Sequence, residues 1–117
     1  MNLLVTGCCG HIGSYLVNNI HKIKKIKKTI IIDNLDSNRF HSILNSKKKN
    51  NLKFFNRDLT DTNSLKDLKN IHYVIHLASM TNAEKSFGKE KEMYKNNIEC
   101  LKNVIQFCKK NNSKLIH

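Results

Sequence analysis

At 117 residues the chain is long enough to bury a hydrophobic core without disulfides or a metal, and we expect one globular domain over residues 1–117. Its formal net charge is +12, from 21 lysines and arginines against 9 aspartates and glutamates. No apolar run approaches the ~20 residues of a transmembrane helix, and the first strand begins almost at Met1. We therefore expect a cytoplasmic protein with no signal sequence and no membrane partner.

The positive charge raises the hypothesis of a nucleic-acid-binding protein, because a basic face gains affinity for phosphate backbones by counterion release. Nineteen of the 21 basic residues are lysines, whereas bidentate recognition favours arginine, and the chain has only Arg39 and Arg57. Lysine, asparagine and isoleucine are enriched along the whole chain and not in one patch. Nucleic-acid binding therefore ranks third among the candidate functions.

The first third of the chain predicts a strand, a helix and a second strand. Residues 3–5 are apolar and suit a short strand that is buried on both faces of a parallel sheet. Residues 29–33 predict the second strand, which Asp33 closes. Between them, residues 11–25 predict a helix on which apolar side chains recur at helical spacing: Ile12, Leu16, Ile20 and Ile23.

The middle of the chain is more polar. Residues 34–51 predict a loop with a short helix around residues 40–44. Residues 52–56 predict a third strand. Residues 60–63 then supply the polar side chains that start helices, and we expect a short helix that bears Leu65 and Leu68.

The last third predicts two more strands and the longest helix. Residues 73–77 predict a fourth strand, residues 86–91 a loop, and residues 114–117 the opening of a fifth strand. The helix before that fifth strand is expected to carry one apolar stripe: Tyr94, Ile98, Leu101, Ile105 and Cys108.

Strands that alternate with helices predict an α/β fold with a doubly wound parallel sheet and right-handed crossovers. With the strands numbered along the chain, the expected order is 3-2-1-4-5, and the chain stops after the start of the fifth strand. Ligands of such sheets bind outside the carboxyl ends of the strands, where the strand order reverses. The functional residues are therefore expected in the segments that follow the first four strands.

The segment after the first strand has the glycine spacing of a dinucleotide-binding turn. Gly7 permits a tight turn, Gly10 lets the backbone approach a pyrophosphate, and Gly13 lets the helix pack closely on the sheet. The helix amides would face the phosphates, and Asp33 is placed to accept hydrogen bonds from ribose hydroxyls. Glycines also mark ordinary turns, but strand, turn, helix, strand and acid within about thirty residues favour the dinucleotide interpretation.

The four cysteines predict no metal or redox site, since none forms a C-x-x-C pair. Cys8 and Cys9 lie in the glycine turn, where small side chains are needed. Cys100 and Cys108 fall on the long helix, where a reduced cysteine behaves as a small apolar residue. Oxidation at an exposed turn is the alternative for the first pair.

Four other polar residues have simple structural interpretations. His72 and His76 share one side of a strand but lie too far apart to bind one metal, and we expect His76 to make local hydrogen bonds. Asp58 and Asp61 flank a predicted helix start and could cap it, so a role of Asp58 at a ligand is one of two alternatives.

Five motifs at matching intervals point to one known family: residues 6–13 (TGCCGHIG), 33–35 (DNL), 57–59 (RDL), 74–79 (VIHLAS) and 96–98 (NNI). With them the chain resembles the N-terminal part of the extended short-chain dehydrogenases/reductases, in the NAD-dependent epimerase/dehydratase group that acts on sugar nucleotides. The resemblance covers nearly the whole chain. It implies a Rossmann-like NAD-binding domain over residues 1–117, without the catalytic segment and the substrate domain.

The resemblance also implies which residues bind the cofactor. The glycine turn with His11 and Ile12 would line the pyrophosphate, and Asp33 with Asn34 would hold the adenosine ribose. The loop that closes over that ribose would contain Asp36, Ser37 and Asn38, and the adenine would meet Asp58 and Leu59. The segment that passes beneath the nicotinamide ribose would contain Leu77, Ala78 and Ser79. The fourth strand would be fixed by Asn96 or Asn97.

Asp33 favours NAD over NADP. A carboxylate about 4 Å from a 2′-phosphate would cost up to about 4 kcal/mol at an effective dielectric constant of about 20. Arg39 could offset this repulsion only if its loop folds back.

Catalysis in this family uses a Tyr-x-x-x-Lys pair with a Ser or Thr, and no tyrosine of this chain is followed by a lysine at that spacing. We therefore predict that the chain is the NAD-binding N-terminal segment of a sugar-nucleotide epimerase/dehydratase-type oxidoreductase. We expect it to contain no catalytic residue and to have no activity. The complete protein would bind a nucleotide-sugar and form a homodimer. The alternative is a short, non-catalytic NAD-sensing module.

Overall fold

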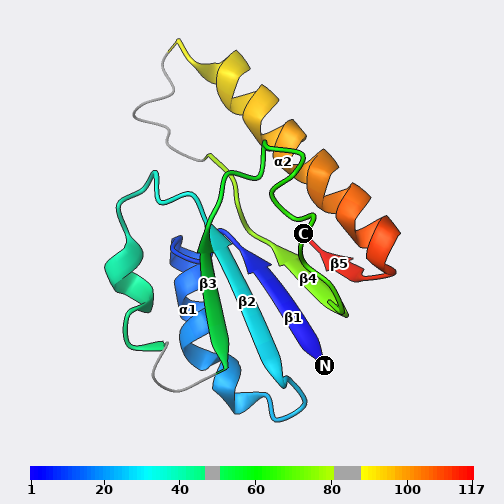
Figure 1. The fold of residues 1–117 in the computed structure, drawn as a ribbon. Helices are drawn as coiled ribbons and strands as arrows, with labels where there is room; N and C mark the ends of the chain where they lie inside the picture. Colours follow the sequence, from blue (N-terminus) through cyan, green and yellow to red (C-terminus); the bar gives the residue numbers. More distant parts are fainter. Residues whose placement is uncertain (47–50, 81–87) are drawn as a thin grey trace.

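Five parallel strands form one sheet, and their order confirms the prediction (Figure 1). The structure, a computed structural model, describes residues 1–46, 51–80 and 88–117, so part of the predicted loop over residues 86–91 lies outside the described residues. The strands are β1 (Asn2–Thr6), β2 (Lys28–Asp33), β3 (Leu52–Asn56), β4 (Tyr73–His76) and β5 (Lys114–Ile116). They lie in the order β3-β2-β1-β4-β5.

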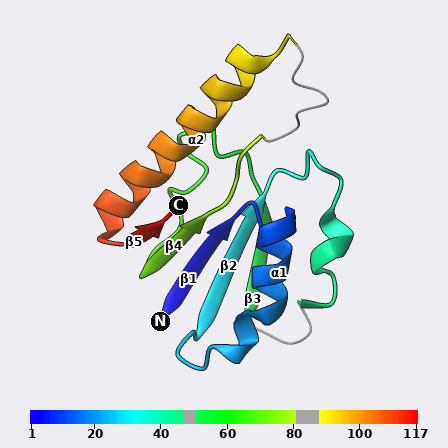
Figure 2. The same cartoon turned by 180° about the vertical axis from the view of Figure 1, so that it is seen from behind.

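Within residues 1–46, 51–80 and 88–117, two α-helices cover opposite faces of this sheet, α1 (His11–Asn19) and α2 (Glu90–Asn111). Side chains alternate along a strand, so Leu3 packs in the core cluster on the α1 side and Leu4 in the cluster on the α2 side. In Figure 1 α1 lies behind the sheet, and Figure 2 brings it to the front. Neither helix has the length and apolar character that crossing a membrane requires, as judged over the described residues.

The strand register brings the carboxyl ends of four strands to one edge of the sheet. Thr6, the last residue of β1, pairs with Ile32 of β2 and with His76 of β4. Asp33 pairs with Asn56 at the end of β3. The segments that leave these strands therefore start side by side, and we call this line of chain the carboxyl edge.

The first helix is shorter than the predicted residues 11–25. It ends at Asn19, and a 3₁₀ helix, η1 (Ile20–Lys22), follows. The Asn19 side chain donates a hydrogen bond to the carbonyl of Tyr15 at 2.8 Å, a local bond that competes with regular helix. Ile23, expected on the buried stripe, therefore lies beyond the helix and is 47% exposed.

The prediction of a short helix that starts at residues 60–63 is wrong, because the structure has a run of turns over residues 59–67. The Asp58 carboxylate accepts hydrogen bonds from the amide and the hydroxyl of Thr60, and Asp61 accepts one from the amide of Asn63, all at 2.8 Å. Such bonds offer the backbone an alternative to the helix. The two leucines expected on that helix are still buried in the core. The short helix expected near residues 40–44 is a 3₁₀ helix, η2 (Phe40–Ile43).

Helix α2 buries only Cys108 of the five residues on the predicted stripe. Tyr94 is 70% exposed, and Ile98, Leu101 and Ile105 are only partly buried. The first turns of α2 project beyond the five-stranded sheet in Figure 1. The side chains that α2 buries are Cys100, Val104, Phe107 and Cys108.

Candidate functional site

The glycine turn connects β1 to α1 at the carboxyl edge. Gly7 has a φ of +68°, a left-handed conformation that favours glycine. A Cβ atom at this position would lie 2.6 Å from the amide nitrogen of Ala78 and 2.6 Å from the carbonyl of Leu77. The turn after β1 is therefore in direct contact with the chain that leaves β4, and a side chain does not fit between them.

The other two glycines of the turn serve different purposes. A Cβ on Gly13 would lie 2.1 Å from the Gly7 carbonyl oxygen, so α1 packs directly on the backbone of the turn. Gly10 has extended backbone angles that any residue adopts, and among the described residues its Cβ would meet only the Gly7 oxygen, at 3.3 Å. The fold therefore constrains Gly10 less tightly than Gly7 or Gly13.

The amino end of α1 opens at the same place. Gly10 is its N-cap residue and provides no side-chain hydrogen bond, and the first turn contains no acidic residue. His11 and Ile12, the first two helical residues, are exposed. The amide groups of such an uncapped first turn, together with the positive end of the helix dipole, attract anions.

Asp33 ends β2 with its carboxylate directed at the glycine turn. Its Oδ2 atom accepts a hydrogen bond from the amide of Cys9, and its Oδ1 atom accepts one from the amide of Leu35, each at 2.9 Å. The residue is partly buried. Two backbone bonds thus hold the carboxylate in place, and each oxygen retains a lone pair for a further donor such as a hydroxyl group.

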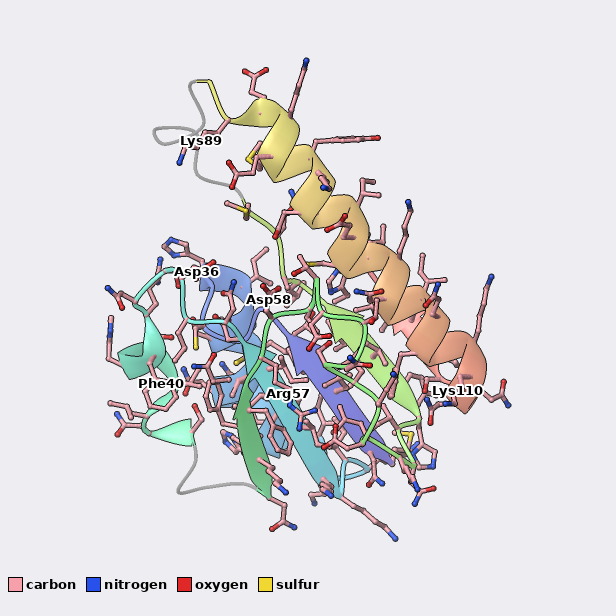
Figure 3. All side chains as sticks on the ribbon, turned by 45° about the horizontal axis from the view of Figure 1, so that its top comes forward. Asp36, Phe40, Arg57, Asp58, Lys89 and Lys110 are labelled. Carbon is pink, nitrogen blue, oxygen red and sulfur yellow. The ribbon has the colours of Figure 1, made fainter. Side chains whose placement is uncertain are left out.

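The loop after Asp33 is held by short-range hydrogen bonds. The Asn34 side-chain amide donates to the Asp36 carboxylate at 2.7 Å, and the Asn38 amide donates to the carbonyl of Leu35 at 2.9 Å. Asn38 adopts a φ of +54°, and Ser37 is exposed. Figure 3 shows Asp36 and Asp58 at the same edge of the sheet.

The same loop folds back onto the turn through Arg39. Its guanidinium contacts the His11 imidazole, with Nη1 2.5 Å from Nε2 and Nη2 3.2 Å from Nδ1. This places a cation beside the amino end of α1. Sequence reasoning raised such a fold-back only as a condition, because the two residues are 28 positions apart and share no motif.

The chain after β3 contributes Asp58 and Leu59. The Asp58 Oδ1 atom caps the turn at Thr60, which supports the structural alternative for one of its oxygens. Leu59 is buried in the core, and its carbonyl accepts a hydrogen bond from the Asn103 side chain at 2.8 Å. A ligand contact from Leu59 would thus come from its backbone. Sequence reasoning missed Asn103, because no motif marks this polar residue on α2.

Asn97 ties the chain after β4 to α2. Its Oδ1 atom accepts a hydrogen bond from the Met80 amide at 2.8 Å, and its Nδ2 donates to the Met80 carbonyl at 3.2 Å. Asn96 instead donates to the side chain of Asn97, at 3.5 Å. Among the described residues, Asn97 is therefore the member of the doublet that holds the chain at Met80. Of the residues before Met80, Leu77 and Ala78 are partly buried and Ser79 is exposed.

Two buried side chains lie directly behind the turn. The Thr6 hydroxyl and the His76 Nδ1 atom are 2.7 Å apart, which confirms the expected local hydrogen bond of His76. Burial, and secondarily the neighbouring His117, lowers the pKa of His76 to about 4, so the imidazole is neutral at physiological pH.

The alternative of oxidation assumed that the cysteines of the turn are exposed. This assumption is wrong, because Cys8 and Cys9 are fully buried. Burial, then the neighbouring Cys9 and Asp33, raises the pKa of the Cys8 thiol. On α2, burial raises the pKa of Cys100 to about 11, with smaller contributions from Asp58 and Glu99. Both groups are therefore thiols, and not thiolates, at neutral pH.

Comparison with known proteins gives a family match and several relatives. The 3-beta hydroxysteroid dehydrogenase/isomerase family matches residues 4–116. The trifunctional UDP-glucose 4,6-dehydratase/UDP-4-keto-6-deoxy-D-glucose 3,5-epimerase/UDP-4-keto-L-rhamnose-reductase of Arabidopsis thaliana is 30% identical over 112 residues, 92% of this chain and 17% of that protein. The dTDP-D-glucose 4,6-dehydratase of Dictyostelium discoideum is 32% identical over 114 residues, 92% of this chain and 26% of that protein.

Among solved structures, a variant UDP-glucuronic acid 4-epimerase from Bacillus cereus, in complex with UDP-4-deoxy-4-fluoro-glucuronic acid and NAD, superposes with a TM-score of 0.80 at 28% identity. The match covers 98% of this chain and 38% of that one. The chain thus spans between a sixth and two fifths of the length of these three relatives.

Proposed function

Since this chain belongs to the 3-beta hydroxysteroid dehydrogenase/isomerase family, within the extended short-chain dehydrogenases/reductases of the epimerase/dehydratase type, we propose that its carboxyl edge binds NAD. One observation carries the proposal: the hydrogen bond from the Cys9 amide to the Asp33 carboxylate. It unites the helix end suited to phosphate and the acid suited to ribose hydroxyls in one site.

The pyrophosphate would lie against the backbone between Gly10 and Gly13, where the first-turn amides of α1 have no side-chain cap. The extended Gly10, with little opposite its missing side chain, supports this position. Asp33 would accept from the adenosine ribose hydroxyls, and the loop that contains Asn34, Asp36, Ser37 and Asn38 would cover that ribose.

The remaining residues would position the two ends of the dinucleotide. The adenine would lie beside Asp58 and the backbone of Leu59. The nicotinamide ribose would lie over Leu77, Ala78 and Ser79, a segment that Asn97 holds through Met80. The contact of Gly7 with this segment links the two halves of the site, because a shift in one moves the other.

In a longer protein this site would serve the chemistry of a nucleotide-sugar epimerase or dehydratase, as the names of the relatives suggest. Bound NAD supplies a reversible hydride acceptor. The chain's own residues bind and orient it, and the three tyrosines lack the Tyr-x-x-x-Lys spacing. We therefore expect residues 1–117 alone to bind NAD without turning over UDP-glucose.

Isothermal titration calorimetry of NAD into the purified chain tests the proposal. We expect saturable binding at one site, and a loss of at least about tenfold in affinity in Gly10→Val, because the added side chain occupies the space of the pyrophosphate. Circular dichroism controls for folding, because a Cβ atom at Gly10 already lies 3.3 Å from the Gly7 carbonyl oxygen. A folded wild-type chain that does not bind NAD, or equal binding by Gly10→Val, would contradict the proposal.

A further inference from the structure

Three groups that can ligate a metal meet beside the glycine turn, the thiols of Cys8 and Cys9 and the carboxylate of Asp33. One ligand atom of each lies within 4.8 Å of the other two. The two Sγ atoms are 4.0 Å apart. The proposed NAD site uses the backbone of this turn, whereas the two thiols pack in the core cluster on the α1 side.

The spacing of the sulfurs suits a tetrahedral cation. Two thiolates on one Zn²⁺ ion, with bonds of about 2.3 Å, lie about 3.8 Å apart, close to the separation of the Cys8 and Cys9 sulfurs. A thiolate and a carboxylate oxygen on the same ion lie about 3.6 Å apart, so the Asp33 oxygen, which lies within 4.8 Å of both sulfurs, has to approach them by at most about 1 Å. A change in its side-chain torsions provides this movement.

The carboxylate already has the outer hydrogen bonds that metal-ligating carboxylates usually carry. The amides of Cys9 and Leu35 each donate to one of its oxygens at 2.9 Å. The cysteines are fully buried, whereas Asp33 is partly exposed. An ion would therefore enter from the side of Asp33, and its fourth position would face water, as in other sites with three protein ligands.

We propose that Cys8, Cys9 and Asp33 form a site for a thiophilic divalent cation, with Zn²⁺ as the candidate ion, and that the occupied site excludes NAD. On binding, two S–H bonds break, two metal–sulfur bonds form and two protons pass to solvent. The exclusion rests on the proposed function, because the cation uses the carboxylate that would accept from the ribose.

Titration of the reduced chain with Cd²⁺, whose thiolate complexes absorb in the near ultraviolet, and with Zn²⁺ by calorimetry tests the site. We expect one ion per chain and the release of about two protons. The double variant Cys8→Ser/Cys9→Ser should lose at least about tenfold in affinity. The matched control Cys100→Ser/Cys108→Ser removes the other two thiols, which lie on α2, and should bind as the wild type does.

Absence of Cd²⁺ binding by the wild-type chain overturns the site, and so does a signal that survives loss of Cys8 and Cys9. Should that variant not fold, alkylation of the wild-type chain, mapped by mass spectrometry, gives a second test. Zn²⁺ must then protect Cys8 and Cys9 and leave the labelling of Cys100 and Cys108 unchanged, and any other pattern overturns the site.

Competition is measured by titrating NAD with and without saturating Zn²⁺. An NAD affinity that Zn²⁺ leaves unchanged overturns the exclusion while the cation site stands. A folded chain that binds Zn²⁺ but no NAD refutes the proposed NAD function and leaves the cation site intact. The two proposals therefore fail by different measurements.

Discussion

The Oδ2 atom of Asp33 accepts a hydrogen bond from the backbone amide of Cys9 at 2.9 Å, and this bond ties the end of β2 to the glycine turn. The other oxygen accepts from the amide of Leu35. One carboxylate thus holds two backbone segments together at the carboxyl edge. Its contribution to stability and its proposed contribution to ribose binding can be measured separately.

Replacing the carboxylate by an amide tests both contributions. In Asp33→Asn one backbone amide faces an NH₂ group in place of an oxygen, so the free energy of unfolding should fall by about 1–2 kcal/mol. The affinity for NAD should fall by at least about tenfold, because an acceptor of the ribose hydroxyls is lost. Urea unfolding and calorimetry give the two values.

Asp36→Asn is the matched stability control, since the Asp36 carboxylate is exposed and accepts a hydrogen bond from the side chain of the nearby Asn34. Its free energy of unfolding should change by less than about 0.5 kcal/mol. If both variants lower the free energy of unfolding equally, the backbone hydrogen bonds of the Asp33 carboxylate add no stability beyond that of an exposed carboxylate.

The choice between NAD and NADP is a second test of Asp33. The wild-type chain should prefer NAD, because the carboxylate repels a 2′-phosphate by up to about 4 kcal/mol at about 4 Å. Asp33→Asn should narrow the ratio of the two affinities by at least about tenfold. Arg39→Gln should widen it, since this guanidinium lies beside the turn, against His11. The affinities of the wild-type chain and both variants for NAD and NADP, measured at one salt concentration, test this prediction. A ratio of the two affinities that neither variant changes would contradict the roles given to Asp33 and Arg39.

The sheet was predictable because its strands are short apolar runs bounded by glycine, polar residues or an acid, and these signals are local. Residues 52–56 are the strand as expected, and the order 3-2-1-4-5 follows from right-handed crossovers. The errors arose where local bonds compete with a periodic pattern. Asn19 ends α1 early, and Asp58 and Asp61 turn the chain where apolar spacing predicted a helix.

The candidate site was predictable to the extent that it depends on backbone shape. The conformation of Gly7 and the tight packing of Gly13 agree with their expected roles in the turn. The contact of Arg39 with His11 depends on how a loop closes in space, and no local pattern encodes it. The same holds for Asn96 and Asn97, because neighbouring residues of one type differ only in which one reaches the chain after β4.

The three-glycine turn predicts unequal costs for the same substitution. Gly13→Ala places a methyl group 2.1 Å from the Gly7 carbonyl oxygen, which forces α1 away from the sheet and should lower the free energy of unfolding by more than about 2 kcal/mol. Gly10→Ala places it at 3.3 Å from the same oxygen and should cost less than about 1 kcal/mol. Chemical unfolding of both variants measures the difference, and equal costs would mean that α1 does not pack on the turn as described.

The buried His76 predicts how stability depends on pH. Its pKa is about 4 in the folded chain and about 6.5 when unfolded, so the unfolded state binds more protons between these values. The contribution of the neutral imidazole is complete above about pH 6.5, falls as the pH drops toward 4, and amounts to roughly 3 kcal/mol. His76→Gln should remove this part of the pH dependence, whereas His21→Gln, at an exposed position on η1, should preserve it. Urea unfolding at several pH values between about 4.5 and 7.5 gives the slope of the unfolding free energy against pH for each variant. If His76→Gln has the same slope as the wild type, the burial of this imidazole next to Thr6 does not govern acid stability.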